Sequence, residues 1–396
     1  MSRLHICCRV AMIDRKKMQG IVSGYDAGGI TVGVMGSHSA IDVLDGASQE
    51  SLRSVAVLQK GRDAVYSRYL RRIGVSNGKA RRGIVDNFIT LSKFSDILSE
   101  ANMKMLRESN AVFVPNRSFT SYCNVGDVED NFSVPLFGSR NLLRSEEREE
   151  KENYYTLLEK AGLPYPEKID SPGDIKLLSI VKLHHARKKL ERGFFTASNS
   201  EEYSKKSRAL LRAGVIDQET LDHARIERYV IGPVFNLDFF YSPLEDEGEK
   251  LELLGIDWRF ESSLDGHVRL PADQQLSLVD SQKIPEYTVV GHNSATLRES
   301  LLDRAFELGE KYVSATGKYF APGIIGPFTL QTCVDKDMNF FIYDVAPRIG
   351  GGTNVHTWSG HPYGNLLYNT NVSTGRRIAM EIRRASAEGR LKEIVT

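Results

Sequence analysis

The chain has 396 residues, 41% of them hydrophobic and 26% charged, which is enough to bury a large core divided into two or three lobes. Its 52 lysine and arginine residues nearly balance 51 aspartate and glutamate residues, so no basic field favours nucleic acid or a membrane surface as a partner. The four cysteines, Cys7, Cys8, Cys123 and Cys333, lack the paired spacing of a zinc site or a redox motif. No apolar run in the sequence approaches the roughly 20 residues that span a bilayer. These features predict a cytoplasmic protein with reduced thiols and without a nucleic-acid or membrane partner.

Residues 1–29 are predicted to form an N-terminal extension and lead-in, because the arginines and short apolar stretch of residues 1–11 lack a signal-peptide core. From Ile30, "ITVGVMGSHSAIDVLDGASQE" indicates a strand, a small-residue turn and an amphipathic helix, and "SVAVLQKG" indicates a second strand. The segment "GIVDNFITL", a helix within residues 94–110 and the strand "AVFVPN" continue this pattern. We therefore expect a parallel α/β domain over residues 30–140.

A charged helix over residues 139–162 is expected to link this domain to a small α+β lobe, the two together covering residues 141–232. The small lobe would contain strands in "LLSIVKL", "GFFTA" and "IERYVIG" and helices near residues 201–212 and 218–225. A C-terminal lobe over residues 233–396 would mix strands with helices near residues 296–317 and 372–388, and "LEDEGEKLE" would be a hairpin tip or loop.

The segment "GPFTLQTCVDKDMNFFIYDVAPRIGGGTNV" carries the clearest chemical pattern. Two apolar strands flank a polar turn at residues 336–339, which would place Gln331 opposite Asp344 on one face of a sheet. A carboxylate and an amide oxygen suit a hard cation such as Mg²⁺, which takes its other ligands from phosphates and water. Arg348 could reach the same phosphates or a developing oxyanion, and the glycines at 350–352 would let backbone amides approach a ligand. The simpler interpretation is a hairpin followed by a flexible glycine turn.

This arrangement resembles the metal-binding end of the ATP-grasp ligases, and the whole chain from about Ile30 resembles the archaeal formate-dependent FAICAR synthetases. The segments that carry the resemblance, in order, are "GSHSAIDVLDGA", "VPNRSFTSYC", "VPLFGSRNLLR", "IVKLHHARKKLERGFF", "IERYVIGPVFN", "ELLGIDWRFESSLDGHVRLPA", "LRESLL", "GPFTLQ" and "STGRRIAMEI". The resemblance implies an ATP-grasp fold of mixed α/β and α+β class with an N-terminal Rossmann-like, pre-ATP-grasp domain. It also implies ATP with Mg²⁺ or Mn²⁺, the substrates formate and AICAR (5-aminoimidazole-4-carboxamide ribonucleotide), and a closed homo-oligomer.

For the nucleotide, the resemblance implies that Lys182, at the end of a strand, pairs with the phosphates. The loop that follows is usually rich in glycine, whereas here it reads "HHARKKLERGFF", so cations such as Arg187 would replace backbone amides over the triphosphate. In the lobe hinge "IERYVIG", the residues Glu227, Tyr229 and Val230 are candidates for adenine and ribose contacts, with Glu261 next. An isolated acid of this kind is otherwise a surface salt-bridge partner.

For the acceptor, the resemblance implies that His38 and Ser118 contact AICAR. His38 could be a catalytic base or a hydrogen-bonding recognition residue, and either His292 or Asn293 could face the carboxamide. Gln331 stands where ATP-grasp enzymes usually have an acid, and Asp344 is shorter than the usual glutamate. ATP would therefore have to bring most of the affinity for the metal.

The implied reaction begins with attack of formate on the γ-phosphorus of ATP, which gives formyl phosphate and ADP. The AICAR amine then attacks the formyl carbon, with Lys182 and Arg348 as the candidate catalytic residues. Three alternatives stay open: a related ligase that joins another carboxylate to another amine, a non-catalytic nucleotide-binding protein, and a folate-dependent transformylase.

Overall fold

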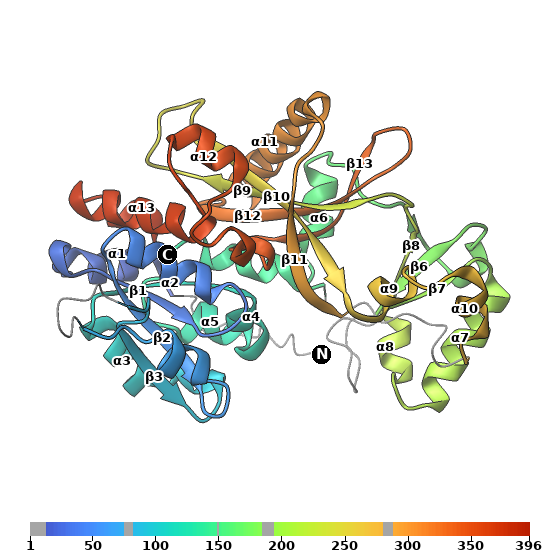
Figure 1. Ribbon diagram of the computed structural model, residues 1–396, viewed down its shortest axis with the longest axis horizontal. Coiled ribbons are helices and arrows are strands. Elements are labelled where there is room, and N and C mark those ends of the chain that lie inside the picture. The colour runs from blue at the N-terminus through green and yellow to red at the C-terminus, as the bar shows by residue number, and fades with distance from the viewer. Residues whose placement is uncertain (1–12, 75–81, 149, 184–193, 280–287) are drawn as a thin grey trace, which may run out of the picture.

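The computed structural model describes residues 13–74, 82–148, 150–183, 194–279 and 288–396, and within them the strands form three sheets (Figure 1). The first is a parallel sheet of order β3-β2-β1-β4. Its strands and the helices around it are β1 (Thr31–Met35), α2 (Ala40–Gln49), β2 (Arg53–Gln59), β3 (Asn87–Leu91), α3 (Glu100–Glu108), β4 (Ala111–Val114), α4 (Arg117–Tyr122) and α5 (Val125–Asn131). The predicted parallel α/β pattern is therefore confirmed. Because the strand order reverses between β1 and β4, the loops after these two strands border a topological switch point, where open α/β sheets bind ligands.

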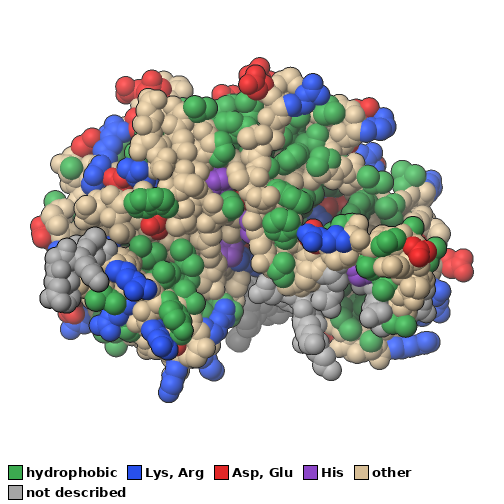
Figure 2. Space-filling view, in the orientation of Figure 1, with side chains coloured by type: hydrophobic (Ala, Val, Ile, Leu, Met, Phe, Trp, Pro, Cys, Tyr) green, Lys and Arg blue, Asp and Glu red, His purple; other side chains and the backbone are tan. Residues whose placement is uncertain are grey.

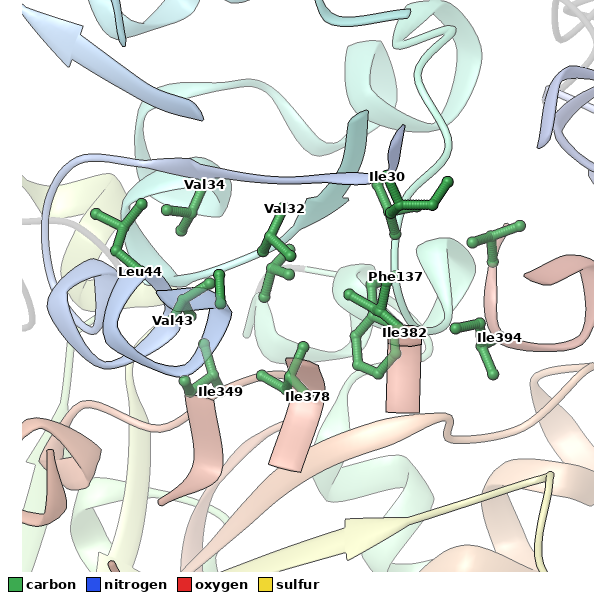
Figure 3. Close-up of a cluster of buried hydrophobic side chains, with 14 of the residues drawn as sticks. Ile30, Val32, Val34, Val43, Leu44, Phe137, Ile349, Ile378, Ile382 and Ile394 are labelled. Carbon is green, nitrogen blue, oxygen red and sulfur yellow. The ribbon is translucent and has the colours of Figure 1, made fainter. Parts of the chain in front are cut away.

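The core of this sheet includes helix α13 (Thr374–Ala387), near the C-terminus, which lies against α2 (Figures 1 and 3). Ile378 and Ile382 of α13 share one buried cluster with Val32 and Val43. The two helices approach closely because glycines face each other: a Cβ atom added to Gly46 would lie 2.2 Å from the carbonyl carbon of Gly375. The end of the chain thus stabilises its beginning. Helix α1 (Arg15–Ser23) likewise packs against α14 (Leu391–Ile394).

The second sheet is antiparallel, of order β5-β8-β6-β7, and forms the small lobe at the right of Figure 1. Its elements are β5 (Lys168–Ile169), β6 (Ser179–Lys182), β7 (Phe194–Ala197), α7 (Ser200–Arg212), α8 (Gln218–Asp222) and β8 (Arg225–Arg228). The predicted helix at 218–225 is shorter than expected, because the chain enters β8 at Arg225.

The third sheet is antiparallel, of order β11-β10-β9-β12-β13. Its strands are β9 (Val234–Tyr241), β10 (Leu251–Glu261), β11 (Val289–Ala295), β12 (Gly326–Val334) and β13 (Phe340–Ala346). Alternate residues such as Leu237, Phe239 and Leu330 join a core with α11 (Leu302–Tyr319) and α6 (Tyr154–Lys160) on one face. The acidic segment after Ser242 connects β9 to β10, as predicted for a hairpin tip. We call this five-stranded sheet the large sheet.

The single charged helix predicted over residues 139–162 is wrong. The chain forms a 3-10 helix η4 (Arg140–Glu146) and, separately, the short helix α6. Helix α6 starts afresh because the side chain of Asn153 accepts hydrogen bonds from the amides of Tyr155 and Thr156, at 3.0 and 3.3 Å. Charged residues of η4 are turned inward, which helical periodicity alone cannot reveal: Arg140 is 1% exposed and donates to four backbone carbonyls.

The remaining helical elements are short. They are η1 (Ala27–Gly29), the π-helix η2 (Val65–Tyr69), η3 (Phe94–Leu98), η5 (Pro172–Asp174), α9 (Ser262–His267), α10 (Ala272–Ser277), η6 (Glu299–Leu301), η7 (Gly352–His356) and α12 (Pro362–Tyr368). In the described parts of the chain, every helix falls short of the length and apolar character that a membrane crossing requires. The division into domains at residues 29, 140 and 232 stays a prediction.

Candidate active site

A row of polar side chains crosses the face of the large sheet opposite α11. The strand register places one or two of these residues on each strand, at positions that alternate with the apolar core. They are His292, Arg259, Asp257, Asn236, Asp238, Thr329, Gln331 and Asp344, and we call this row the polar face. Hydrogen bonds connect neighbours along it, including Asn236 to Asp257 at 2.8 Å and Thr329 to Asp238 at 2.7 Å. Polar residues on an otherwise buried sheet indicate a binding surface rather than a core.

At one end of the polar face, Gln331 lies directly opposite Asp344, as predicted. The turn between their strands covers residues 335–339, close to the predicted 336–339. The side-chain oxygen of Gln331 accepts a hydrogen bond from Arg259, which also donates to the hydroxyl of Tyr343 at 2.9 Å. Asp344 is buried and accepts from the amide of Val345 at 3.1 Å. No group of three or more acidic, histidine or cysteine side chains suited to a metal occurs among the described residues, so a metal here would rest on this amide and carboxylate pair.

Lys182 ends β6 and is buried between the small lobe and the large sheet. Its ammonium group lies 2.6 Å from Glu227, 2.8 Å from the hydroxyl of Tyr155 and 3.1 Å from the carbonyl of Tyr343. Burial lowers the pKa of Lys182 to about 8, against the opposing effect of Glu227. Burial alone would raise the pKa of Glu227, but Lys182 and Arg225, the latter at 2.5 Å, hold it below its usual value. The pair is therefore ionised at neutral pH, and Glu227 holds the lysine in place. Arg187 lies outside the described residues.

Tyr229 and Val230 lie in the connection between β8 of the small lobe and β9 of the large sheet. The amide of Tyr229 donates to the carbonyl of Leu178 at 2.9 Å, and the carbonyl of Val230 accepts from the thiol of Cys333 at 3.6 Å. Burial, with a contribution from the nearby charge of Glu261, raises the pKa of Tyr229. Tyr229 and Val230 thus lie in the connection between the lobes with the charge of Glu261 near Tyr229, whereas Glu227, in the same predicted hinge, pairs with Lys182.

His38 and Ser118 lie just after β1 and β4, at the topological switch point of the parallel sheet. His38 follows β1, and Ser118 lies in α4 after β4. The side chain of Asn116 ties the two loops together by donating to the carbonyls of Met35 and Ser37, at 2.9 and 3.0 Å. His38 has a left-handed backbone, with φ of 55°, a conformation that is uncommon outside glycine and concentrates at functional sites. Its Nδ1 lies 3.0 Å from the hydroxyl of Ser39, which makes no cap hydrogen bond to α2.

The three glycines after Arg348 pass between the N-terminal loops and the polar face. A Cβ atom on Gly350 would lie 2.5 Å from the Thr329 hydroxyl, and one on Gly352 would lie 2.1 Å from the carboxyl carbon of Asp257. A Cβ atom on Gly351 would lie 3.0 Å from Nε2 of His38 and 3.7 Å from Nε2 of His292. At Gly350 and Gly352, the protein's own side chains therefore require the bare backbone that the sequence suggested was needed for a ligand.

His38 and His292 thus both approach the Cβ position of Gly351, one from the loop after β1 and the other from β11. Histidine side chains are visible in the hollow at the middle of the face drawn in Figure 2. His292 points to the polar face, where its Nδ1 lies 2.7 Å from Asp257. The next residue along β11, Asn293, pairs with Trp258 and is exposed. Strand alternation therefore puts His292, and not Asn293, beside His38.

Arg348 is held by a buried carboxylate that the sequence analysis did not single out. Glu146 accepts two hydrogen bonds from its guanidinium, at 3.2 and 2.5 Å, and Arg117 lies 3.3 Å from the same carboxylate. Burial, and then the positive charge of Arg348, hold the pKa of His38 well below its usual value. His38 is therefore neutral, which favours hydrogen-bonding recognition over proton acceptance.

Comparisons with known proteins agree with this architecture. Residues 32–169 match a family model described as "Protein of unknown function (DUF1246)", and residues 202–396 match "Domain of unknown function (DUF1297)". A protein of Methanopyrus kandleri named 5-formaminoimidazole-4-carboxamide-1-(beta)-D-ribofuranosyl 5'-monophosphate synthetase is 40% identical over 97% of this chain and 100% of its own length. The chain belongs to this synthetase family. A synthetase of the same name from Methanobrevibacter smithii is 39% identical over 95% of this chain and 97% of its own.

Solved structures support the same family and fold. The crystal structure of an IMP biosynthesis protein PurP from Thermococcus kodakaraensis is 30% identical, covers 92% of this chain and 100% of its own, and has a TM-score of 0.67. An ADP complex of N5-carboxyaminoimidazole ribonucleotide synthetase is 12% identical, covers 87% of this chain and 78% of its own, and has a TM-score of 0.55. That second likeness bears on the fold alone. The predicted ATP-grasp fold of this synthetase family member is confirmed.

Sequence reasoning missed several members of the polar face, namely Asn236, Asp238, Asp257 and Arg259. A signal for them exists in the strands "VFNLDFFY" and "LELLGIDWRFE", where polar residues alternate with large apolar ones. Alternation of this kind indicates a strand with one apolar and one polar face. Glu146 lies in the run "SEEREE", and nothing in the sequence of that run distinguishes it from the other acidic residues.

Proposed function

We propose that this synthetase is an ATP- and formate-dependent ligase that converts AICAR to its 5-formyl derivative, FAICAR, and releases ADP and phosphate in IMP biosynthesis. The observation that carries the proposal is the full-length similarity to proteins named as synthetases of that product. The arrangement of candidate residues supports it: a buried lysine and a hinge suit a nucleotide, and a switch-point loop beside a polar face suits a second, phosphorylated substrate.

The first step activates formate, which has no good leaving group. An oxygen of formate attacks the γ-phosphorus of ATP, the bond from that phosphorus to the bridging oxygen of ADP breaks, and formyl phosphate forms. In this step Lys182 would neutralise phosphate charge, and Glu227 would hold its ammonium in position. Tyr229, Val230 and Glu261 would contact the adenine and ribose.

The second step transfers the formyl group to the amine. AICAR would bind at the switch point with its polar groups on His38 and Ser118, close to the glycine loop and His292. The 5-amino nitrogen attacks the formyl carbon, and the tetrahedral oxyanion collapses with loss of phosphate. Arg348, fixed by Glu146, would stabilise the negative charge that develops there.

A divalent metal fits the donor set at the end of the polar face. Asp344 and Gln331 would hold Mg²⁺ or Mn²⁺ through one carboxylate and one amide oxygen, ligands that hard cations prefer. The Gln331 oxygen would first have to give up its hydrogen bond from Arg259. When bound, the metal would neutralise charge on the triphosphate. We include in the proposal a homo-oligomer and a cytoplasmic location, which suits soluble metabolites.

The proposal is tested by incubating the purified protein with ATP, Mg²⁺, formate and AICAR in the absence of folate. We expect ADP and FAICAR in equal amounts, each dependent on formate and AICAR. ADP without FAICAR would point to a related ligase with a different acceptor. FAICAR that appears only when a formyl-folate replaces formate and ATP would indicate a transformylase. ATP binding without any product would indicate a non-catalytic protein.

A further inference from the structure

A chain of three titratable side chains crosses the polar face behind Gly351. Nδ1 of His292 lies 2.7 Å from Oδ1 of Asp257. The same oxygen accepts a hydrogen bond from the side chain of Asn236 at 2.8 Å. The carboxyl group of Asp257 adjoins that of Asp238, and each of these two groups keeps a buried Oδ2 without a hydrogen-bond partner among the described residues. His292 is the only member of the three with an exposed side-chain edge, because both aspartates are at most 2% exposed.

The hydrogen bonds indicate which of these three side chains carries the negative charge. Oδ1 of Asp257 accepts from the side-chain amide of Asn236 and also lies beside Nδ1 of His292, whereas Oδ1 of Asp238 accepts from Thr329 alone, so we assign the negative charge to Asp257. Two adjacent buried carboxyl groups cannot both be ionised at low cost, so the proton belongs to Asp238. Burial, and then the charge of Asp257, raise the pKa of Asp238 well above its usual value. A proton on Oδ2 of Asp238 would satisfy the two oxygens that lack partners.

This charge distribution also fixes the tautomer of His292. Because the carboxylate of Asp257 accepts at Nδ1, the neutral ring carries its proton there, and the lone pair of Nε2 faces the space beside Gly351. His38 borders the same space with opposite electrostatics, since the positive charges of Arg348 and Arg117 disfavour its protonation. Of the two histidines, only His292 has a negative partner that would stabilise the imidazolium.

We propose that His292 is the group that accepts the proton of the attacking amine, and that Asp257, supported by Asn236 and a protonated Asp238, is its positioning residue. This inference rests on the proposed function. As the C–N bond forms and the bond from the formyl carbon to the phosphate oxygen breaks, one N–H proton moves to Nε2 of His292. The imidazolium is paired with Asp257, and the proton leaves to solvent or to the departing phosphate.

Other charged groups surround His292. Arg259 of β10 is the register partner of His292 on β11. His356 belongs to η7, which packs against both of these strands. Arg259 is engaged with Gln331 and Tyr343, and burial lowers the pKa of His356. Neither offers a negative charge to His292, so its carboxylate partner among these groups is Asp257.

The test compares wild type with His292→Gln, Asp257→Asn and Asp238→Asn, and uses His223→Gln, an exposed histidine at the end of α8, as the matched control. Two assays run in parallel: FAICAR formation from AICAR across pH 5–9, and capture of formyl phosphate by hydroxylamine as the hydroxamate. Hydroxylamine needs no base at neutral pH, so the second assay reports formate activation alone. Circular dichroism and thermal melting confirm that each variant is folded.

We expect His292→Gln to lower kcat for FAICAR formation by about 100-fold or more and to lose the acidic limb of the profile. Hydroxamate formation should stay within about threefold of wild type. Asp257→Asn should lower the plateau and move the acidic limb down by about one pH unit or more, because the imidazolium loses its counter-charge. Asp238→Asn imitates the protonated acid, so its kcat for FAICAR formation should fall less than that of Asp257→Asn.

Three outcomes would overturn the inference. FAICAR formation by His292→Gln within threefold of wild type with an unchanged pH profile would remove the proton-acceptor role. Equal losses of FAICAR and hydroxamate would reduce His292 to a structural residue. A greater loss of FAICAR formation in Asp238→Asn than in Asp257→Asn would show that Asp238, and not Asp257, carries the negative charge. If instead the wild type forms hydroxamate but no FAICAR, or neither, the proposed function itself fails.

Discussion

Replacing Glu227 by glutamine should change how ATP binding depends on pH, because Glu227 is the counter-charge of Lys182. The two charged atoms lie 2.6 Å apart and both side chains are buried. With a pKa of about 8, Lys182 is about 90% protonated at pH 7 in the wild type. Loss of an adjacent opposite charge shifts a pKa by about 1–3 units, here downward. The variant would then carry a charged Lys182 in about half of the molecules at pH 7, or in far fewer.

The dissociation constant of ATP, measured by calorimetry from pH 6 to 9, gives the comparison. In wild type the affinity should hold steady up to about pH 7.5 and fall as pH rises through about 8. In Glu227→Gln the fall should begin at least one pH unit lower, since neutral Lys182 no longer attracts phosphate. The same midpoint in both proteins would contradict this reasoning.

Folding must be separated from binding, because removing one partner of a buried ion pair costs about 3–5 kcal/mol of stability. Urea unfolding measures that loss directly. The double variant Lys182→Met with Glu227→Leu should recover much of the stability without recovering ATP affinity. Glu219→Gln, at an exposed glutamate of α8, is the matched control and should match wild type in both assays.

Further changes should act through contacts already described. Gly352→Ala should destabilise the protein by about 1–3 kcal/mol and lower kcat, because its Cβ would lie 2.1 Å from the carboxyl carbon of Asp257. The control is Gly317→Ala in α11, where an added Cβ meets nothing within 4 Å. This control should leave kcat unchanged and raise stability by about 0.5–1 kcal/mol. Asp344→Ala should raise the Mg²⁺ concentration for half-maximal ADP release at least about tenfold in a metal titration, and an unchanged requirement would exclude this carboxylate as a ligand. Arg348→Lys keeps the charge but loses the two-bond pairing with Glu146, so denaturant unfolding should show a loss of about 1–3 kcal/mol, with kcat falling more than KM rises.

The parts of the fold that depend on interactions between neighbouring residues could be predicted from the sequence. The β12–β13 hairpin could be predicted because a polar turn separates two apolar strands, and Gln331 does lie opposite Asp344 as expected. The turn is one residue longer than predicted, however, and a β-bulge between Gln331 and Thr332 restores this pairing, which the sequence pattern did not reveal. The parallel sheet was evident from repeated strand and helix patterns, and the loops after β1 and β4 meet because parallel strands end at one edge. The segments that carry His38 and Ser118 are joined at that edge by Asn116, and their contact with the substrate stays a prediction.

Partners that are distant in the chain could not be predicted in this way. Glu146 pairs with Arg348 from 202 positions away, and Asp257 reaches His292 across 35. The prediction of a charged helix over residues 139–162 was wrong for the same reason. Arg140 donates hydrogen bonds to carbonyl oxygens of other segments instead of facing solvent. The choice between His292 and Asn293 depended on which of the two side chains points to the polar face. A register error of one residue exchanges the two faces of a strand, so the sequence alone left this choice open.

The most direct measurement follows the oxygen atoms of formate. The protein is given ATP, AICAR and formate labelled with ¹⁸O in both positions, without folate, and the released phosphate is analysed by mass spectrometry. Formation of formyl phosphate predicts one ¹⁸O atom in each phosphate and one in each formyl group of FAICAR. Unlabelled phosphate alongside FAICAR would show that formate does not attack the γ-phosphorus, and would contradict the proposed ligase mechanism.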